Sequence, residues 1–206
     1  MRIALFLLLV APVVVIIIVL ALFLPAYKKT ANTRDSVAVT ETGEGGVSCH
    51  NSAKYFAIEK NLSPDVGSDI LIKYKTSPAK IPKCAYFVAS GDFELKGLDA
   101  AYFLDFTDNF LLLDTGTAPP PRGLVVYDLR SRRKVYADMY EKPVTIFGDT
   151  ITYFSQSSEK PTPENCPKLS EYAANGLGAV LMSKVSVDLS TFDRTDLGQT
   201  ECIAVQ

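Results

Sequence analysis

The sequence contains few of the residues on which metal-binding and hydrolytic proteins rely. It has a single histidine, His50, and its four cysteines form no C-x-x-C pair. Zinc sites take their ligands in closely spaced pairs, so no metal site is expected. A hydrolytic triad has no support either, because no G-x-S-x-G motif accompanies the histidine. Neither a phosphate-binding loop nor a dinucleotide fingerprint is present, and no cofactor is expected.

An excess of charge of one sign is also absent. The chain has 21 lysines and arginines against 23 aspartates and glutamates, a net charge of -2. Nucleic-acid-binding domains carry clustered positive charge, so we expect no nucleic-acid partner. The densest basic run, RSRRK at 130–134, lies between two expected strands, which favours a hairpin turn. The functional alternative for this run is contact with anionic lipid headgroups or an acidic partner.

A long apolar run opens the chain. Residues 3–24 include no charged and no strongly polar residue. A helix of this length, at about 1.5 Å per residue, crosses the hydrocarbon core of a bilayer. The run is longer than the apolar region of a secretory signal, and Leu24 occupies a position where cleavage requires a small residue. The sequence therefore predicts an uncleaved transmembrane signal-anchor over 1–27, with a cleaved signal peptide as the alternative.

The composition changes after the anchor. Residues 28–46 are polar, small and end in glycines, which predicts a flexible linker. Residues 47–206 are then long enough for one domain with its own core. Three basic residues follow the apolar run and only Arg2 precedes it, so the positive-inside rule would place this domain in the cytoplasm.

The cysteines indicate the opposite orientation. Cys49, Cys84, Cys166 and Cys202 are even in number and widely spaced. Such cysteines behind an export segment are typical of two disulfides and an oxidising compartment, although ordinary buried thiols are the alternative. Four cysteines allow three pairings, and we favour the sequential one because it closes two loops of similar length. The domain is therefore expected outside the cytoplasm, in a periplasmic or extracellular location.

Strand patterns dominate the domain and predict a mainly β fold. Short connections between the segments favour an antiparallel meander. Residues 50–60 fit either a helix or a strand. The expected strands are 70–75, 84–90, 101–106, 110–114, 123–129, 134–140, 144–147, 150–154, 178–190 and 202–206.

One short helix is expected at 163–176. Asn165 or Cys166 would cap its amino terminus, and Pro167 would occupy its first position. Gly176 follows where a left-handed residue commonly ends a helix.

The stretch LLLDTGT at 111–117 resembles the catalytic strand of a pepsin-like or retroviral aspartic peptidase. The resemblance implies Asp114 as the catalytic acid, with Thr115 and Gly116 forming its turn, and TIFG at 145–148 as the neighbouring strand. Such enzymes need two carboxylates that share a proton. No second copy of the motif is present, so this alternative requires a homodimer. The prolines at 119–121 also depart from the family pattern.

An internal repeat gives another interpretation of the same region. FTDNFLLL at 106–113 aligns with FGDTITYF at 147–154, and VVYDLRS at 125–131 aligns with VSVDLST at 185–191. The phrase resembles the blade repeats of β-propellers over about 100–198. The resemblance implies a blade-like antiparallel β-meander.

Asp114 aligns with Ser155 in this repeat, so the repeat needs no acid at that position. The interpretation makes Asp114 structural, with its carboxylate accepting hydrogen bonds from the backbone or from Thr115 and Thr117. We therefore expect a membrane-anchored binding or scaffolding module without catalysis, for which an unidentified protein is a candidate partner. The homodimeric peptidase remains the alternative.

Overall fold

The computed structural model describes residues 39–43 and 46–206. The expected anchor at 1–27, and most of the expected linker, lie outside the described residues. Within the described ranges, no helix has the length and apolar character needed to cross a bilayer.

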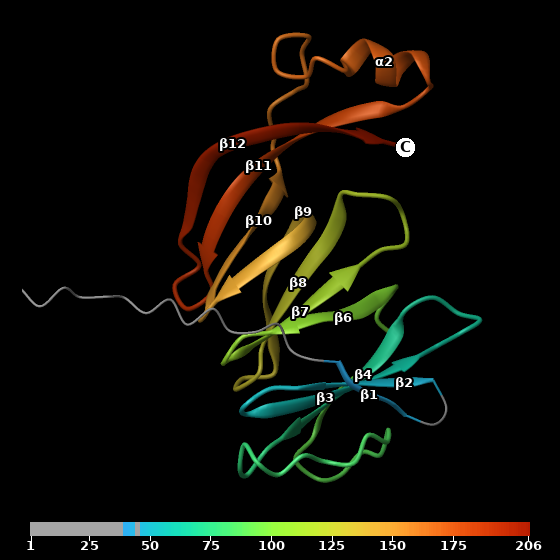
Figure 1. The fold of residues 1–206 in the computed structure, drawn as a ribbon, viewed down its shortest axis with the longest axis vertical. Helices are drawn as coiled ribbons and strands as arrows, with labels where there is room; N and C mark the ends of the chain where they lie inside the picture. Colours follow the sequence, from blue (N-terminus) through green and yellow to red (C-terminus); the bar gives the residue numbers. More distant parts are fainter. Residues whose placement is uncertain (1–38, 44–45) are drawn as a thin grey trace, which may run out of the picture. The chain divides into compact units, whose positions relative to one another are not determined.

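The described chain is mainly β, with two antiparallel sheets and one short helix (Figure 1). The strands of each sheet follow one another in sequence order, which confirms the predicted antiparallel arrangement. The first sheet comprises β1 (Val39–Gly43), β2 (Val47–Asn51), β3 (Tyr55–Asn61), β4 (Ser68–Tyr74) and β5 (Phe93–Leu95).

The second sheet runs from β6 to β12. Its first four strands are β6 (Ala101–Phe106), β7 (Phe110–Thr115), β8 (Arg122–Asp128) and β9 (Arg133–Phe147). Its last three are β10 (Thr150–Gln156), β11 (Gly178–Asp188) and β12 (Arg194–Val205). Figure 1 shows β11 and β12 as long neighbouring strands.

The start of the domain differs from the sequence-based expectation. β1 lies inside the segment 28–46 that was expected to be linker, and it pairs with β2. The undecided stretch 50–60 contains the end of β2 and most of β3, joined by a turn in which the Ser52 N–H donates to the Tyr55 carbonyl.

The strand expected at 84–90 is wrong. This segment is a loop, and β5 takes the place beside β4, with Ile70 opposite Leu95. Cys84 is bonded to Cys49 in β2, and the Lys73 ammonium donates to the Phe87 carbonyl. Aromatic and β-branched residues favour a strand only where a neighbouring strand is free to pair with them, and these contacts hold the loop elsewhere.

The strands expected at 134–140 and 144–147 form one strand, β9. Its first half pairs with β8 and its second half with β10, so the strand that β9 pairs with changes near Tyr140. Pro143 lies where the register between β9 and β10 shifts. A residue without an N–H fits such an interruption of the ladder, so the proline does not break the strand.

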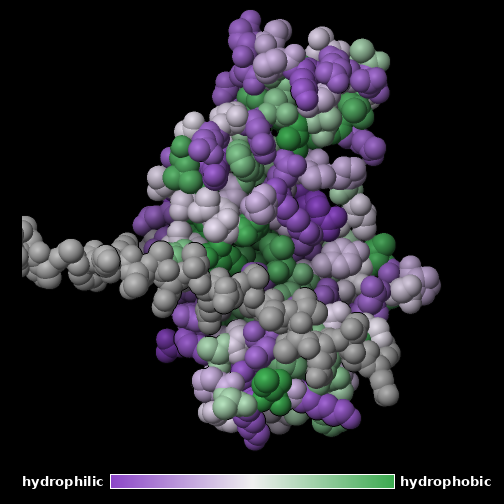
Figure 2. Space-filling model, in the orientation of Figure 1, coloured by the Kyte–Doolittle hydropathy of each residue, from purple (hydrophilic) through white to green (hydrophobic). Residues whose placement is uncertain are grey.

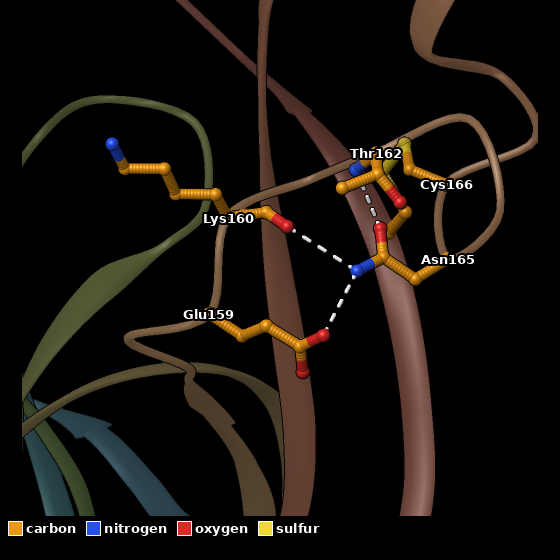
Figure 3. The surroundings of a disulfide bond; sticks show 6 residues. Glu159, Lys160, Thr162, Asn165 and Cys166 are labelled. Carbon is orange, nitrogen blue, oxygen red and sulfur yellow. Dashed lines mark hydrogen bonds between the residues drawn. A yellow bond between two sulfur atoms is a disulfide. The ribbon is translucent and has the colours of Figure 1, made fainter.

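The helix is shorter than expected. α2 spans Leu169–Ala174, and Lys168 stands at its N-cap position without a capping bond from its side chain. The predicted caps, Asn165 and Cys166, and the predicted first position, Pro167, therefore lie before the helix. The preceding residues form turns, because the Asn165 side chain accepts from the Thr162 N–H and donates to the Lys160 carbonyl and the Glu159 carboxylate (Figure 3). Gly176 follows the helix with φ +71°, as predicted.

The cysteines pair in the favoured order. Cys49 is bonded to Cys84, and Cys166 is bonded to Cys202. The first bond fixes the loop between β4 and β5 to β2. The second fixes the insert that carries α2 to the last strand, β12. Each bond closes a loop of similar length and constrains the unfolded chain accordingly.

The internal repeat is visible in matching hydrogen bonds at two hairpin turns. After β8, the Arg132 N–H donates to the Asp128 carbonyl at 2.7 Å, and Arg132 has φ 59°. After β11, the Phe192 N–H donates to the Asp188 carbonyl at 2.7 Å, and Phe192 has φ 62°. The two aspartates also accept turn N–H groups through their side chains. The two turns that end the aligned segments 125–131 and 185–191 are therefore equivalent in structure, although the described strands form two sheets instead of a ring of four-stranded blades.

β7 is the most deeply buried strand. Phe110 and Leu112 belong to a core cluster that also draws residues from β8, β10 and β11. Leu111 and Leu113, on the opposite face, belong to a second cluster that includes Ile70 and other residues of the five-stranded sheet. The apolar run at 110–113 is continuous because both faces of β7 are covered.

Leu112→Ala tests this arrangement. Leu112 is fully buried, so the change should lower the free energy of unfolding by about 2–5 kcal/mol through lost transfer and cavity formation. Val66→Ala is the control, since Val66 is exposed and should change stability by less than about 0.5 kcal/mol. Urea unfolding of both variants measures the difference. Equal effects would contradict the burial of β7 on both faces.

Candidate functional site

Asp114 lies inside β7, one residue before the strand ends. Its side chain is buried, with the residue 4% exposed. Gly116 follows with φ +105°, a conformation that favours glycine, so the predicted turn is present. The expected hydrogen bonds from Thr115 and Thr117 are not the contacts of the carboxylate. The Thr115 hydroxyl donates instead to the Gly123 carbonyl.

Two cations hold the Asp114 carboxylate. The Nε of Arg122 donates to Oδ1 at 2.6 Å, and the Nζ of Lys142 lies 3.0 Å from Oδ2. The Arg122 guanidinium also lies over the ring of Tyr102. Burial, followed by the negative charge of Asp114, raises the pKa of Tyr140. The residues around the carboxylate line a surface pocket of about 420 Å³.

Within one chain, the contacts of Asp114 differ from those of a catalytic aspartate, and the homodimeric alternative would take its second carboxylate from another copy. A catalytic aspartate shares a proton with a second carboxylate and orients a water. Both oxygens of Asp114 contact cations, and no carboxylate lies among the other residues that line its pocket. The segment 145–148 forms the end of β9 and its turn, where Thr145–Phe147 pair with Thr150–Thr152 of β10. Asp114 therefore has the contacts of a structural ion pair.

His50 joins the two sheets. Its ring stacks on Phe103 of β6, with the centroids 3.8 Å apart, and its Nε2 lies 3.4 Å from a Glu59 oxygen. The other Glu59 oxygen accepts from the Phe103 N–H at 3.0 Å. Burial raises the pKa of Glu59, but hydrogen bonds from His50, Phe103 and Ser68 outweigh it and leave the pKa below its ordinary value.

A polar network surrounds Asp138 on the first half of β9. Its Oδ2 accepts from Tyr153, Ser155 and Arg194 at 2.7–2.9 Å, and from Tyr136 at 3.2 Å. Burial, followed by the hydrogen bonds of Tyr153 with Tyr136 and Asp138, raises the pKa of Tyr153. Ser155, the repeat equivalent of Asp114, is fully buried. The oxygen is saturated by donors, so the network ties β9, β10 and β12 together and offers no reactive group.

A cavity of about 340 Å³ lies where the two sheets meet. The five-stranded sheet and the loop before β5 contribute Lys54, Tyr55, Ile72, Tyr74, Gly91 and Phe93. The turns of the seven-stranded sheet contribute Asn109, Leu129, Arg130 and Arg132. Three of these side chains are aromatic, three are cationic and none is acidic.

The β8–β9 turn closes one wall of this cavity. Arg132 donates to the carbonyls of Gly91 at 2.6 Å and Asp92 at 3.2 Å, which joins the turn to the other sheet. Lys54 and Arg130 are exposed and make no side-chain hydrogen bond or ion pair among the described residues. Asp108 and Asp128 lie close enough for their charges to raise the pKa of Tyr55, after burial and Tyr74. Neither carboxylate lines the cavity.

Of the residues that line this cavity, the sequence singled out only those of the basic run. The basic run at 130–134 forms the predicted hairpin turn, and two of its arginines line the cavity. Lys54, Tyr55 and Tyr74 were not identified, because the local pattern of β3, of β4 and of the turn before β3 does not indicate which other sheet covers them. Only the packing of β4 and β5 against the turns of the second sheet brings them together.

Comparison of the chain with protein-family models, with curated proteins and with solved structures finds no match.

Asp114→Asn tests the ion pair. The change keeps the shape of the side chain but removes its charge beside Arg122 and Lys142, so it should destabilise by about 1–3 kcal/mol. Asp65→Asn is the matched control, since Asp65 is exposed and its side chain has no hydrogen-bond partner in the described chain. Thermal unfolding distinguishes the two. A loss no larger than that of the control would contradict a structural role for the pair.

Glu59→Gln tests the joint between the sheets through its pH dependence. Because the folded pKa of Glu59 is below its ordinary value of 4.5, its contribution is fully present above that value. The contribution is lost as the pH falls through the folded pKa. The variant should be less stable than the parent at neutral pH by about 1–2 kcal/mol, and the difference should shrink in acid.

Unfolding midpoints across the acid range measure this difference. Glu171→Gln, at an exposed position on α2, should follow the parent curve throughout. A constant gap between parent and Glu59→Gln would show that the carboxylate is not the source of the pH dependence.

Proposed function

We propose that the protein is a membrane-tethered, extracytoplasmic binding module, and that the cavity between its two sheets is its ligand site. The apolar run at 3–24 supports the tether. The two disulfides support an oxidising compartment, because they persist where thiols are not kept reduced. The cavity is the observation that carries the binding role.

The size and lining of the cavity suit a small organic ligand. Its volume of about 340 Å³ falls within the range of small-molecule sites. Tyr55 and Tyr74 meet edge to face with ring centroids 5.8 Å apart. Together they form an aromatic wall of the cavity. Phe93 packs against Tyr127 nearby. Such walls bind planar or apolar groups.

The charges select an anionic ligand. Lys54 and Arg130 have no partner in the described chain that would compete for them. A carboxylate, sulfonate or phosphate entering the cavity would meet these cations without an acidic side chain in the lining. The ligand class is therefore a planar or apolar body that carries one anionic group.

A ligand-binding experiment tests the site. 1-Naphthalenesulfonate combines an aromatic body with an anion, and it should bind more tightly than the neutral 1-naphthalenemethanol. Replacing Lys54 and Arg130 together by alanine should weaken sulfonate binding by about tenfold and remove the preference over the alcohol. Titration followed by protein chemical shifts measures both affinities.

Two further variants complete this experiment. Tyr74→Ala should weaken both probes, because the ring contributes to the wall and carries no charge. Lys168→Ala, before α2, should leave both affinities unchanged. Equal binding of the sulfonate and the alcohol to the parent chain would contradict an anion site.

The compartment and the tether have their own test. Freshly isolated full-length chain should show no thiol reactive to maleimide, and reduction should release all four cysteines. The chain should also stay in the membrane fraction through an alkaline carbonate wash. Reactive thiols before reduction would favour the cytoplasmic orientation, and release by carbonate would contradict the tether.

A further inference from the structure

The loop between β4 and β5 exposes a group of large apolar side chains. Phe87 is 73% exposed, Ile81 55% and Val88 44%. Single exposed apolar residues are common on protein surfaces, and Figure 2 shows several among hydrophilic residues on one face. Three such residues lie within one short loop, which we call the apolar loop (76–92). Exposure of this much apolar surface to water is unfavourable unless another surface covers it.

The apolar loop is held in place while its apolar side chains point outward. Cys84 is bonded to Cys49, and the Lys73 ammonium donates to the Phe87 carbonyl and the Asp92 carboxylate. The Tyr86 hydroxyl donates to Glu94. Cys84 and Tyr86 pack against a core cluster of the five-stranded sheet. These contacts fix the backbone of the apolar loop, so Phe87 is exposed in the folded domain.

The apolar loop lies close to the strand by which the chain enters the domain. Glu41 of β1 is opposite Cys49 of β2, and the disulfide joins Cys49 to Cys84 with the Cα atoms 5.9 Å apart. Phe87 follows Cys84 by three residues, which span about 10 Å at most. If the proposed tether holds the apolar run in the bilayer, the segment 25–38 can span about 50 Å at most, so β1 stays within that distance of the membrane.

The charge of the apolar loop matches an anionic surface. Lys80 and Lys83 flank Ile81, are exposed, and make no side-chain bond among the described residues. Asp92, the acidic residue of the loop, is paired with Lys73 at 2.6 Å. Aromatic and apolar side chains together with lysines are the composition that lies at the boundary of lipid headgroups and acyl chains.

We propose that the apolar loop docks on the membrane surface, with Phe87, Val88 and Ile81 entering the headgroup boundary and Lys80 and Lys83 contacting anionic headgroups. The proposal rests on the proposed tether, which supplies the high local concentration that a small docking site needs. The membrane contact orients the domain on the bilayer and covers the exposed apolar side chains.

The absence of tryptophan from the sequence makes a direct test possible. Phe87→Trp places a single tryptophan at the tip of the apolar loop in the full chain, which we call the loop probe. Phe147→Trp places one at an exposed site at the end of β9, away from the loop in sequence and sheet, which we call the control probe. Each chain is reconstituted in vesicles of phosphatidylcholine and phosphatidylglycerol, with or without acyl-chain-brominated phosphatidylcholine as a quencher.

The expected result is quenching of the loop probe by the brominated lipid, by about twofold or more, while the control probe is quenched far less. The emission of the loop probe should also lie at shorter wavelength than that of the control probe. Equal quenching of the two probes, or loop-probe emission typical of water, would overturn the proposal. Because the vesicles contain no other protein that could cover the apolar loop, this result would also favour a protein partner over a lipid surface.

Charge reversal separates lipid docking from chance proximity. Lys80→Glu with Lys83→Glu in the Phe87→Trp chain should reduce quenching on vesicles with phosphatidylglycerol, since each lysine near an anionic surface strengthens contact by about fivefold. Vesicles of phosphatidylcholine alone should show a smaller effect of the same change. An unchanged loop-probe signal in both lipids would contradict the role of the lysines.

The same samples distinguish failure of the loop from failure of the tether. Quenching is read first, and the vesicles are then washed with alkaline carbonate. Chain that stays with the vesicles while the loop probe remains exposed to water contradicts the loop and leaves the tether intact. Chain released by the wash contradicts the tether, and the quenching already measured still decides whether the loop contacted lipid.

Discussion

The burial of β7 on both faces is the constraint on which the rest of the domain depends. Leu111 and Leu113 pack toward the five-stranded sheet, while Phe110 and Leu112 pack into the core enclosed by the two halves of the seven-stranded sheet. A strand covered on both sides has no solvent face, so its apolar residues run without alternation. The joint between the sheets, and the cavity beside it, exist because this strand serves both cores.

Polar contacts define the edges of that apolar arrangement. Asp114 ends the apolar run of β7 and meets Arg122 and Lys142 at the rim of the core. Its repeat equivalent, Ser155, is likewise buried and accepts from Arg194 beside Asp138. In both halves of the repeat, a buried polar residue near the end of a central strand contacts an arginine of the same sheet, from the adjacent strand β8 for Asp114 and from β12, two strands away, for Ser155. Buried polar groups require such partners.

The proposed binding surfaces, by contrast, carry charged side chains that lack partners within the described chain. The side chains of four cations make no hydrogen bond or ion pair in the described chain: Lys54 and Arg130 at the cavity, and Lys80 and Lys83 on the apolar loop. Lys54 and Arg130 lie beside aromatic side chains of the cavity, and the two lysines of the apolar loop lie near its exposed apolar side chains. Groups held in place by a disulfide or a hairpin turn, yet left without a partner, are well arranged for an external one.

The sequence by itself determined the mainly β class and the antiparallel order, and it favoured the sequential pairing of the cysteines among three. These follow from local periodicity, from aspartates and glycines that require particular turns, and from the spacing and even number of the cysteines. It also identified Asp114 and the basic run 130–134, though not the contacts of either.

Tertiary structure alone decided what these residues do. Residues 84–90 have the composition of a strand, yet the Cys49–Cys84 bond and the pairing of β4 with β5 leave them as an exposed loop. Residues 134–147 have two apolar patterns separated by a proline, yet they form one strand because each half pairs with a different neighbour. Asp114 precedes a glycine turn, yet Arg122 and Lys142 make it an ion pair. In each case the deciding partner is distant in sequence or belongs to another strand, and local periodicity carries no information about it.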